Sequence, residues 1–242
     1  MPNSIEVIKL TKIYKSKSAV SNINFKINEN EIVGLLGPNG CGKTTTIGMI
    51  LGLLKPTSGD VLINGTNIEK NKISILHKMN FISPYVELPK KLKVKQNLIV
   101  YGKLYNVRDL EEHIDYLANK LRLSELLNKI TGELSSGQKN RVGLAKALIN
   151  DPSVLLLDEP TASLDPETGD FVRTFLENYR KEKKISVLLA SHNMDEVKRL
   201  CGSVLMMKDG TIVDSGTPNE LITKYGRKNL EEVFLQIVRN KE

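Results

Sequence analysis

The chain has 242 residues and a formal net charge of +7, and this length suits one large α/β domain or one domain with an inserted subdomain. The basic residues are scattered, with no run of five and no interleaved aromatics, so we interpret most of them as a solvated face and expect no nucleic-acid partner. No apolar stretch approaches the ~18 residues that span a bilayer, and no signal-peptide pattern opens the chain, which predicts a soluble, cytosolic chain.

The first predicted elements are antiparallel strands. Residues 23–27 alternate apolar and polar side chains, which is typical of a strand with one buried face. Val61 and Ile63 stand beside the turn signal Asn64-Gly65. We therefore expect a half-exposed antiparallel β subdomain in the N-terminal part of the chain.

A phosphate-binding pattern follows a short apolar run at residues 32–36. The pattern G-x-x-x-x-G-K-[ST] is matched by Gly37, Pro38, Asn39, Gly40, Cys41, Gly42, Lys43, Thr44 and Thr45. Helical spacing then relates Ile47, Ile50, Leu51 and Leu54, so a strand, a glycine-rich loop and a helix follow one another. Glycines let the backbone wrap round a phosphate chain, so that N–H groups and the positive helix end face the anion. A structural glycine turn before a helix is the alternative.

Individual residues of this loop have predicted roles. Lys43 is expected to reach the β- and γ-phosphates, and the Thr44 hydroxyl to bind Mg²⁺. Cys41 is expected to contribute a small side chain and a backbone N–H. Cys201 falls on the apolar stripe of a later helix, which predicts a buried small hydrophobe rather than a disulfide partner. The three histidines are too far apart in sequence to predict a metal site.

The pattern is helical from about residue 86 to residue 149. A stripe of apolar residues comprises Val94, Leu98, Tyr101, Leu104 and Tyr105. Asp109 with Glu112 resembles a helix start. These features predict a helical subdomain inserted into the α/β core. Near its end, Ser135 and Gln138 have the spacing of a capping box, which indicates either a well-capped helix or an anion site at the helix N-terminus.

The parallel core resumes at residues 154–157 and 186–190, which are mostly apolar runs typical of strands covered on both faces. The helix between them begins with Asp165 as N-cap and buries Phe171, Phe175 and Tyr179. Asp209-Gly210 turns a hairpin. Asn193, Thr217 and Asn229 mark three further helix starts, so a helical end is expected at about 217–242.

Two acids end the first of these strands. Asp158 and Glu159 follow residues 154–157 directly, which places them at the carboxyl edge of the sheet, where the phosphate loop also lies. Asp158 is expected to hold Mg²⁺, and Glu159 to deprotonate a water that attacks the γ-phosphate. Two adjacent acids after a strand are alternatively only a turn.

Together these motifs resemble the nucleotide-binding subunit of an ABC transporter, from Ile5 to about Val238. Residues 37–45 match the family's Walker A motif and 154–159 its Walker B motif. Leu134-Ser135-Ser136-Gly137-Gln138 is one substitution from the L-S-G-G-Q signature, and Ser163-Leu164-Asp165 resembles the D-loop. The ending at 229–235 resembles ATPase subunits of exporters whose membrane part is a separate chain.

The resemblance implies a P-loop ATPase of ABC type, with ATP and Mg²⁺ as its ligands. It implies that Tyr14 stacks on adenine and that His192 braces the γ-phosphate and the attacking water. ATP is sandwiched between two subunits in this family, so Ser135, Gly137 and Gln138 would contact the partner's nucleotide, and Asp165 would link the two sites. His192 is alternatively only a helix-start residue.

One position departs from the family pattern. An alignment without gaps places Pro84 where the family has its Q-loop glutamine, and proline has neither a side-chain oxygen nor a backbone N–H. Either Ser83 or water replaces the contact, or the coupling works differently.

The leading hypothesis is an ATP-hydrolysing subunit of a separate membrane exporter. Its expected partners are a transmembrane permease subunit and a second ATPase subunit, and its expected place is the cytoplasmic face of the membrane. The alternatives are a non-transport ABC ATPase that acts on nucleic acid or ribosomes, and a nucleotide-binding regulator without turnover.

Overall fold

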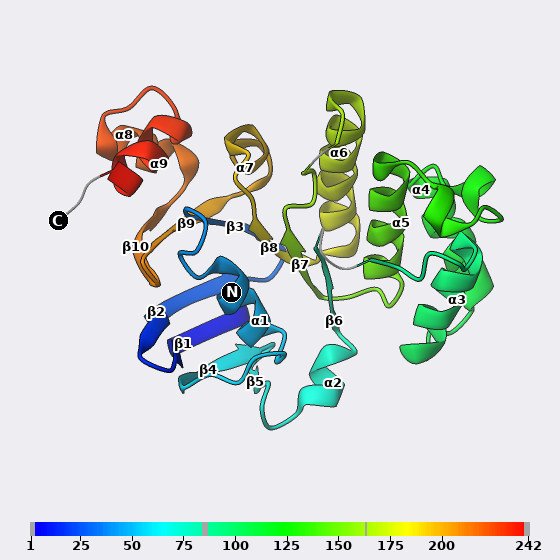
Figure 1. Ribbon diagram of the computed structural model, residues 1–242, viewed down its shortest axis with the longest axis horizontal. Helices are drawn as coiled ribbons and strands as arrows, with labels where there is room; N and C mark the ends of the chain where they lie inside the picture. Colours follow the sequence, from blue (N-terminus) through cyan, green and yellow to red (C-terminus); the bar gives the residue numbers. More distant parts are fainter. Residues whose placement is uncertain (1–2, 84–86, 163, 240–242) are drawn as a thin grey trace. The chain divides into compact units, whose positions relative to one another are not determined.

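The computed structural model describes residues 3–83, 87–162 and 164–239 (Figure 1). These residues form two compact units, one made of the chain up to Leu76 and from Ser186 onward, the other of His77–Ile185. The positions Pro84 and Ser163, singled out in the sequence, lie outside the described residues.

An antiparallel sheet of order β2-β1-β4-β5 begins the first unit. Its strands are β1 (Asn3–Tyr14), β2 (Lys17–Asn28), β4 (Ser58–Ile63) and β5 (Thr66–Asn67). Ile27 and Phe25 of β2 are buried and lie opposite Ile5 and Val7 of β1. Asn64 and Gly65 have positive φ angles, as a tight hairpin turn requires. The predicted antiparallel strands are confirmed.

The first unit also contains parallel strands. They are β3 (Ile32–Leu36), β8 (Ser186–Ala190) and β9 (Ser203–Lys208), with β10 (Thr211–Gly216) beside them. β3 pairs in parallel with both β8 and β9, and β10 pairs antiparallel with β9. Every residue of β3 and β8 is buried, which explains their continuous apolar sequence. Asp209 and Gly210 turn the predicted hairpin with positive φ.

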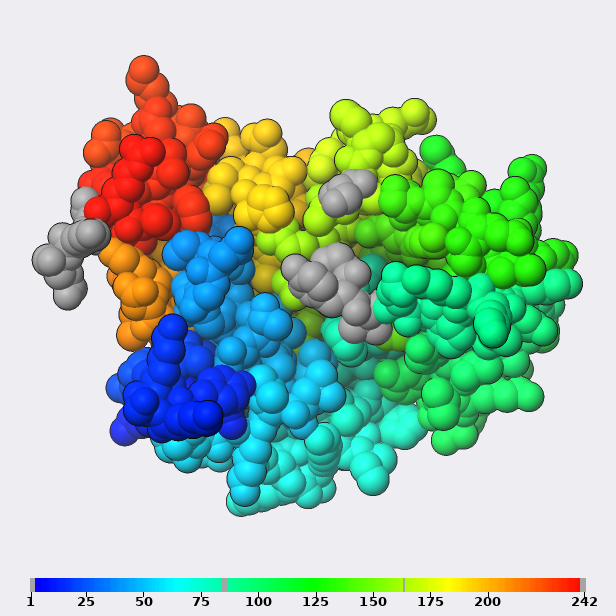
Figure 2. All heavy atoms as spheres, viewed as in Figure 1, coloured from blue at the N-terminus to red at the C-terminus, as the bar shows by residue number. Residues whose placement is uncertain are grey.

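The helices of the first unit are α1 (Lys43–Ile50), α2 (Lys72–Leu76), α7 (Met194–Leu200), α8 (Pro218–Tyr225) and α9 (Leu230–Arg239). Asn193, Thr217 and Asn229 each accept a backbone N–H three residues on, so the predicted helix starts are confirmed. In Figure 2 the red atoms of α8 and α9 lie against the yellow atoms of α7, which α9 contacts. Cys201 is buried as expected.

The second unit contains two parallel strands and the remaining helices. The strands are β6 (Met79–Ile82) and β7 (Val154–Asp158), which pair in register from Met79 opposite Val154. The helices are α3 (Val94–Leu104), α4 (Leu110–Lys120), α5 (Ser136–Leu148) and α6 (Pro166–Lys183). Single 3₁₀ turns lie at Ser124–Leu126 and Thr131–Glu133.

Several sequence expectations need correction. The helical pattern is not continuous over the described residues up to 149, because residues 87–93, 105–109 and 121–135 lie outside the α-helices. α4 is followed by Arg122, whose φ is +53°, and by two 3₁₀ turns. Leu104 lies on the same apolar stripe as the buried Val94 and Leu98, but it is 67% exposed. Asp109 stands at the start of α4 but makes no side-chain cap, because its left-handed backbone (φ 47°) is not the extended conformation that N-cap residues adopt. Phe171 is half-buried beneath the Arg122 guanidinium, 4.5 Å from the ring centre.

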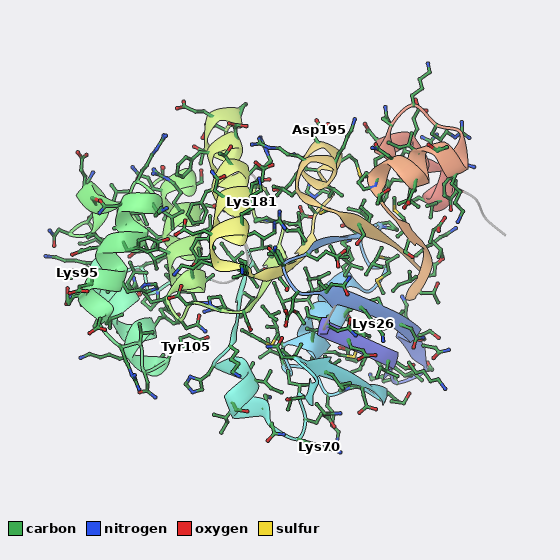
Figure 3. The ribbon with its side chains drawn as sticks, turned by 180° about the vertical axis from the view of Figure 1, so that it is seen from behind. Lys26, Lys70, Lys95, Tyr105, Lys181 and Asp195 are labelled. Atoms are coloured by element: carbon green, nitrogen blue, oxygen red, sulfur yellow. The ribbon has the colours of Figure 1, made fainter. Side chains whose placement is uncertain are left out.

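The C-terminal ends of α1 and α3 are set by single residues. α1 ends at Ile50, and Leu54 lies beyond it because Gly52 adopts a left-handed φ of 63°. In α3, Tyr105 is the C-cap and is labelled in Figure 3. The Tyr105 and His77 rings are nearly perpendicular, with 5.9 Å between their centres. Lys95 of the same helix pairs with Glu111 of α4, an exposed pair that adds little stability.

Candidate nucleotide-binding site

The glycine-rich loop joins β3 to α1 in the first unit. Gly40 and Gly42 have φ angles of 81° and 112°, which L side chains rarely adopt. A Cβ at Gly37 would lie 2.3 Å from the carbonyl oxygen of Met207 in β9. Gly42 is the N-cap of α1. The first N–H groups of a helix have no partner within it, so this loop presents donors and the positive end of α1 to one place.

The Lys43 side chain folds back over this loop. Its Nζ lies 2.6 Å from the Gly37 carbonyl oxygen and 3.2 Å from that of Pro38. The ammonium is thus held at the concave side of the loop, where it can pair with phosphate oxygens. The next residue, Thr44, is exposed and offers its hydroxyl to an oxygen-binding cation.

The loop is fixed to its own unit by backbone hydrogen bonds. Cys41 N–H donates to the Pro38 carbonyl at 3.2 Å, and Gly210 N–H donates to the Cys41 carbonyl at 3.0 Å. Burial raises the pKa of the Cys41 thiol, so this side chain stays protonated and acts as filling. Cys41 therefore has the small structural part predicted for it.

Two further predicted residues belong to this unit. The Tyr14 ring, at the end of β1, is 46% exposed, and the Lys12 ammonium lies 5.1 Å from its centre. His192 is exposed and follows β8, the parallel neighbour of β3. Because the carboxyl ends of parallel strands share an edge of the sheet, His192 and the glycine-rich loop leave the same edge.

A buried polar pair supports the His192 segment. Ser191 Oγ donates to Glu196 Oε2 at 2.6 Å and accepts the Asn193 N–H at 3.1 Å. Glu196 is fully buried. The sequence predicted a helix start at Asn193 but did not predict the hydrogen bond between Ser191 and Glu196. Asp195 of the same turn is exposed and points outward in Figure 3.

The acidic pair lies in the second unit. Asp158 ends β7 and is 7% exposed, while Glu159 is half-buried with a left-handed φ of 52°. Such backbone strain in a non-glycine residue persists only where its surroundings enforce it, and it is concentrated at functional sites. A cavity of about 330 Å³ adjoins both acids, and its lining includes Ser83, Ser136 and Asn140.

The capping box predicted at the start of α5 is confirmed. Gln138 N–H donates to Ser135 Oγ at 3.3 Å, and Ser135 N–H donates to Gln138 Oε1 at 3.0 Å. Ser135 itself is exposed. A Cβ at Gly137 would lie 3.1 Å from Thr168 Cγ2, so this glycine allows α5 to approach α6 closely.

Asp165 is the N-cap of α6, as predicted. Its carboxylate accepts the Thr168 N–H at 2.9 Å, and this bond lowers the pKa of Asp165. The side chain is exposed, so an ionised carboxylate stands at the surface beside the start of α5.

Comparison with known proteins decides the family. A family model described as "ABC transporter" matches residues 20–162. The bacitracin transport ATP-binding protein of Bacillus licheniformis is 36% identical over 96% of this chain and 75% of that protein. The chain belongs to the ABC transporter family. The Nod factor export ATP-binding protein I of Rhizobium johnstonii is likewise 36% identical to this ABC protein, over 91% of it and 71% of the relative.

A solved ABC structure confirms the predicted fold. The dimeric post-hydrolysis state of an ATP-binding cassette with ADP and Pi has a TM-score of 0.81 and 26% identity, covering 88% of this chain and 98% of that one. The ABC protein is therefore an ATP-binding, ATP-hydrolysing subunit with a P-loop fold. Within the described residues, none of its helices is both long and apolar enough to cross a membrane.

The predicted residues of this ABC ATPase divide between the two units. Lys43 and its loop, Tyr14 and His192 belong to the first unit. The remaining predicted residues belong to the second: Asp158, Glu159, Ser135, Gly137, Gln138 and Asp165. Asn140 was missed by sequence reasoning, because its contact is with a residue 20 positions away.

Proposed function

We propose that the chain hydrolyses Mg·ATP and that two such ATPase subunits power export through a separate membrane-spanning subunit, at the cytoplasmic face of the membrane. The geometry of the glycine-rich loop carries this proposal, because Lys43 and the start of α1 face one anion-binding place. Relatives named for bacitracin transport and Nod factor export support the export role. The same names do not favour action on nucleic acid or ribosomes.

The first unit would bind the nucleotide. Backbone N–H groups of the loop, except at Pro38, would surround the phosphates. Lys43 would exchange its carbonyl partners for phosphate oxygens, a stronger charge-assisted pairing. The exposed Tyr14 ring is available to stack on adenine.

Thr44 and Asp158 would hold the metal. A hydroxyl and a carboxylate are hard oxygen donors, and Thr44 is exposed while Asp158 ends a strand, so these residues fit Mg²⁺. When bound, Mg²⁺ would neutralise charge on the phosphate oxygens.

Glu159 and His192 would act on the attacking water. Glu159 would accept the proton of that water as general base, and its enforced φ of 52° would fix the direction of the carboxylate. His192 would donate to the γ-phosphate from a segment held by Ser191 and Asn193.

The start of α5, in the second unit, would serve the nucleotide of a partner subunit. The exposed start of α5 offers the Ser135 hydroxyl, the Gly137 and Gln138 N–H groups and a positive helix end, which together suit an anion. The exposed Asp165 carboxylate would connect the two sites across the dimer.

Phosphate release from Mg·ATP by the purified chain tests this proposal, with Lys43→Ala and Glu159→Gln as variants. We expect Lys43→Ala to abolish turnover, and Glu159→Gln to slow it by ~10² or more while ATP still binds. Glu159→Gln should elute as a dimer with ATP in size-exclusion chromatography. Normal turnover by Lys43→Ala would refute the loop assignment, and an ATP-bound Glu159→Gln monomer would refute the paired mechanism.

The export part of the proposal needs its own measurement. Tagged full-length chain, expressed at native level and purified in mild detergent, should retain a multi-spanning membrane protein. A chain that hydrolyses ATP but co-purifies only with ribosomes or nucleic acid would overturn the export role while leaving the ATPase assignment intact.

A further inference from the structure

One side of α5 is built for close approach to the segment around Glu159. Gly137, Asn140 and Gly143 lie three residues apart along this helix. A Cβ at Gly137 would lie 3.1 Å from Thr168 of α6, and one at Gly143 would lie 3.2 Å from Ile82 of β6. The two glycines therefore let α5 pack tightly on both sides of Asn140.

Asn140 makes a direct bond to the turn that follows the acidic pair. Its Nδ2 donates to the Pro160 carbonyl oxygen at 2.6 Å. Pro160 comes directly after Glu159, and Ala162 N–H donates to the Glu159 carbonyl at 3.1 Å. These two bonds hold the carbonyl groups of two successive residues, Glu159 and Pro160.

This turn needs outside support. Glu159 has a left-handed φ of 52°, a conformation that is unfavourable for a non-glycine residue and persists only when the surroundings enforce it. Pro160 has no N–H with which to anchor the turn. The Asn140 amide therefore supplies an anchor that the backbone of the turn cannot supply itself.

The other half of the Asn140 amide points to a specific role. Its Oδ1 is buried and has no hydrogen-bond partner among the described residues, although leaving a buried acceptor unpaired is costly. An apolar side chain at this position would avoid that cost. The Asn140 amide therefore destabilises the fold through its unpaired oxygen, and its contribution is the hydrogen bond that its nitrogen donates to Pro160.

We propose that Asn140 is a positioning residue for ATP hydrolysis, which holds the Glu159 carboxylate in its productive direction by anchoring the Pro160 carbonyl. This inference rests on the proposed role of Glu159 as general base. Asn140 lies on the helix whose first turn carries Ser135 and Gly137. In a dimer, those residues would contact one ATP while Glu159 acts on the other. The Asn140–Pro160 bond therefore links, within one chain, the residues that serve the two ATP molecules.

The test is steady-state ATP hydrolysis by Asn140→Ala and Asn140→Asp, with Asn178→Ala as control. Asn140→Asp keeps the side-chain volume but loses the donor, and Asn178 is an exposed residue of α6. Because small displacements of catalytic groups reduce rates strongly, we expect kcat to fall about tenfold in both Asn140 variants. KM for ATP should change less than about twofold, since nucleotide binding rests on other residues. Asn178→Ala should match the wild type.

A second measurement separates positioning from general structural damage. In a Glu159→Gln background, Asn140→Ala should form the ATP-dependent dimer as fully as Glu159→Gln alone, because the removed bond anchors the turn after residue 159 and none of the residues proposed to bind ATP. Loss of that dimer, a raised KM, or an unchanged kcat would each overturn the proposal. If wild type does not hydrolyse ATP, the proposed function fails with it. A different result would overturn only the positioning role of Asn140: an active wild type, an inactive Lys43→Ala variant, and an Asn140→Ala variant with normal kcat.

Discussion

Lys146 is a buried lysine, and we predict how its replacement by methionine changes the stability of the fold as a function of pH. The residue is 8% exposed, and its Nζ lies 3.2 Å from Asn80 Oδ1 and 3.4 Å from the Phe81 carbonyl. The rings of Phe81 and Tyr101 lie 5.1 and 5.3 Å from the ammonium. Within the described part of the chain no carboxylate pairs with Lys146, and desolvation lowers its pKa from 10.5 to about 8.

The direction of the pH dependence follows from this lowered pKa. Between about pH 8 and the unfolded value of 10.5, the unfolded chain binds more protons at Lys146 than the folded chain does. The free energy of unfolding therefore rises with pH through this window. Below about pH 8 the buried charge destabilises the fold, by about 3 kcal/mol relative to a neutral lysine. Roughly 2 kcal/mol of this is recovered between about pH 7 and about pH 9.5.

Lys146→Met should remove this dependence. Methionine keeps an unbranched side chain of similar length and can fill the same space. Asn80 Oδ1 would still accept the Phe81 N–H at 2.9 Å, so the substitution leaves that oxygen paired. We expect the variant to be more stable than wild type by about 1–3 kcal/mol near pH 7, after loss of the cation–π contacts, and to lose this advantage as the pH rises.

Urea unfolding followed by circular dichroism, at several pH values from about 7 to about 9.5, measures this difference. Burial raises the pKa of Tyr116, Tyr179 and both cysteines, so the stability that these groups contribute declines as the pH rises above their unfolded pKa values. Wild type and Lys146→Met share these groups, so their effect cancels in the difference between the two proteins. Parallel stability profiles for wild type and Lys146→Met would refute the argument that Lys146 is desolvated.

Two further predictions follow from close contacts in the first unit. Gly37→Ala should abolish ATP binding, measured by calorimetry, because its Cβ would lie 2.3 Å from the Met207 carbonyl and 2.4 Å from Cys41 Sγ; tight binding by a folded variant would contradict this. Ser191→Ala should lower the free energy of unfolding by about 1–3 kcal/mol, since the fully buried Glu196 loses its donor at 2.6 Å. Unchanged stability of Ser191→Ala in urea would show that Glu196 finds another donor.

The features that depend on neighbouring residues were predictable from the sequence. The strand, loop and helix around Lys43 lie within one short stretch, and the left-handed φ angles of Gly40 and Gly42 are local properties of that stretch. The caps at Ser135, Asp165, Asn193 and Thr217 each join residues three positions apart, so their spacing is visible in the chain. The core strands appear as uninterrupted apolar runs because both of their faces are buried.

Tertiary packing alone decided the features that join distant residues. Asn140 meets Pro160 across 20 positions, and Lys146 meets Asn80 across 66. Neither partner has a sequence signal, because which side chains face each other depends on how α5 packs against other elements. The same holds for the burial of Glu196 and for the exposure of Leu104, which shares an apolar helical stripe with the buried Val94 and Leu98. Periodicity shows which residues share a helix face, whereas the neighbouring elements determine whether that face is covered, and therefore which charges lose water and which backbone turns are held in strain.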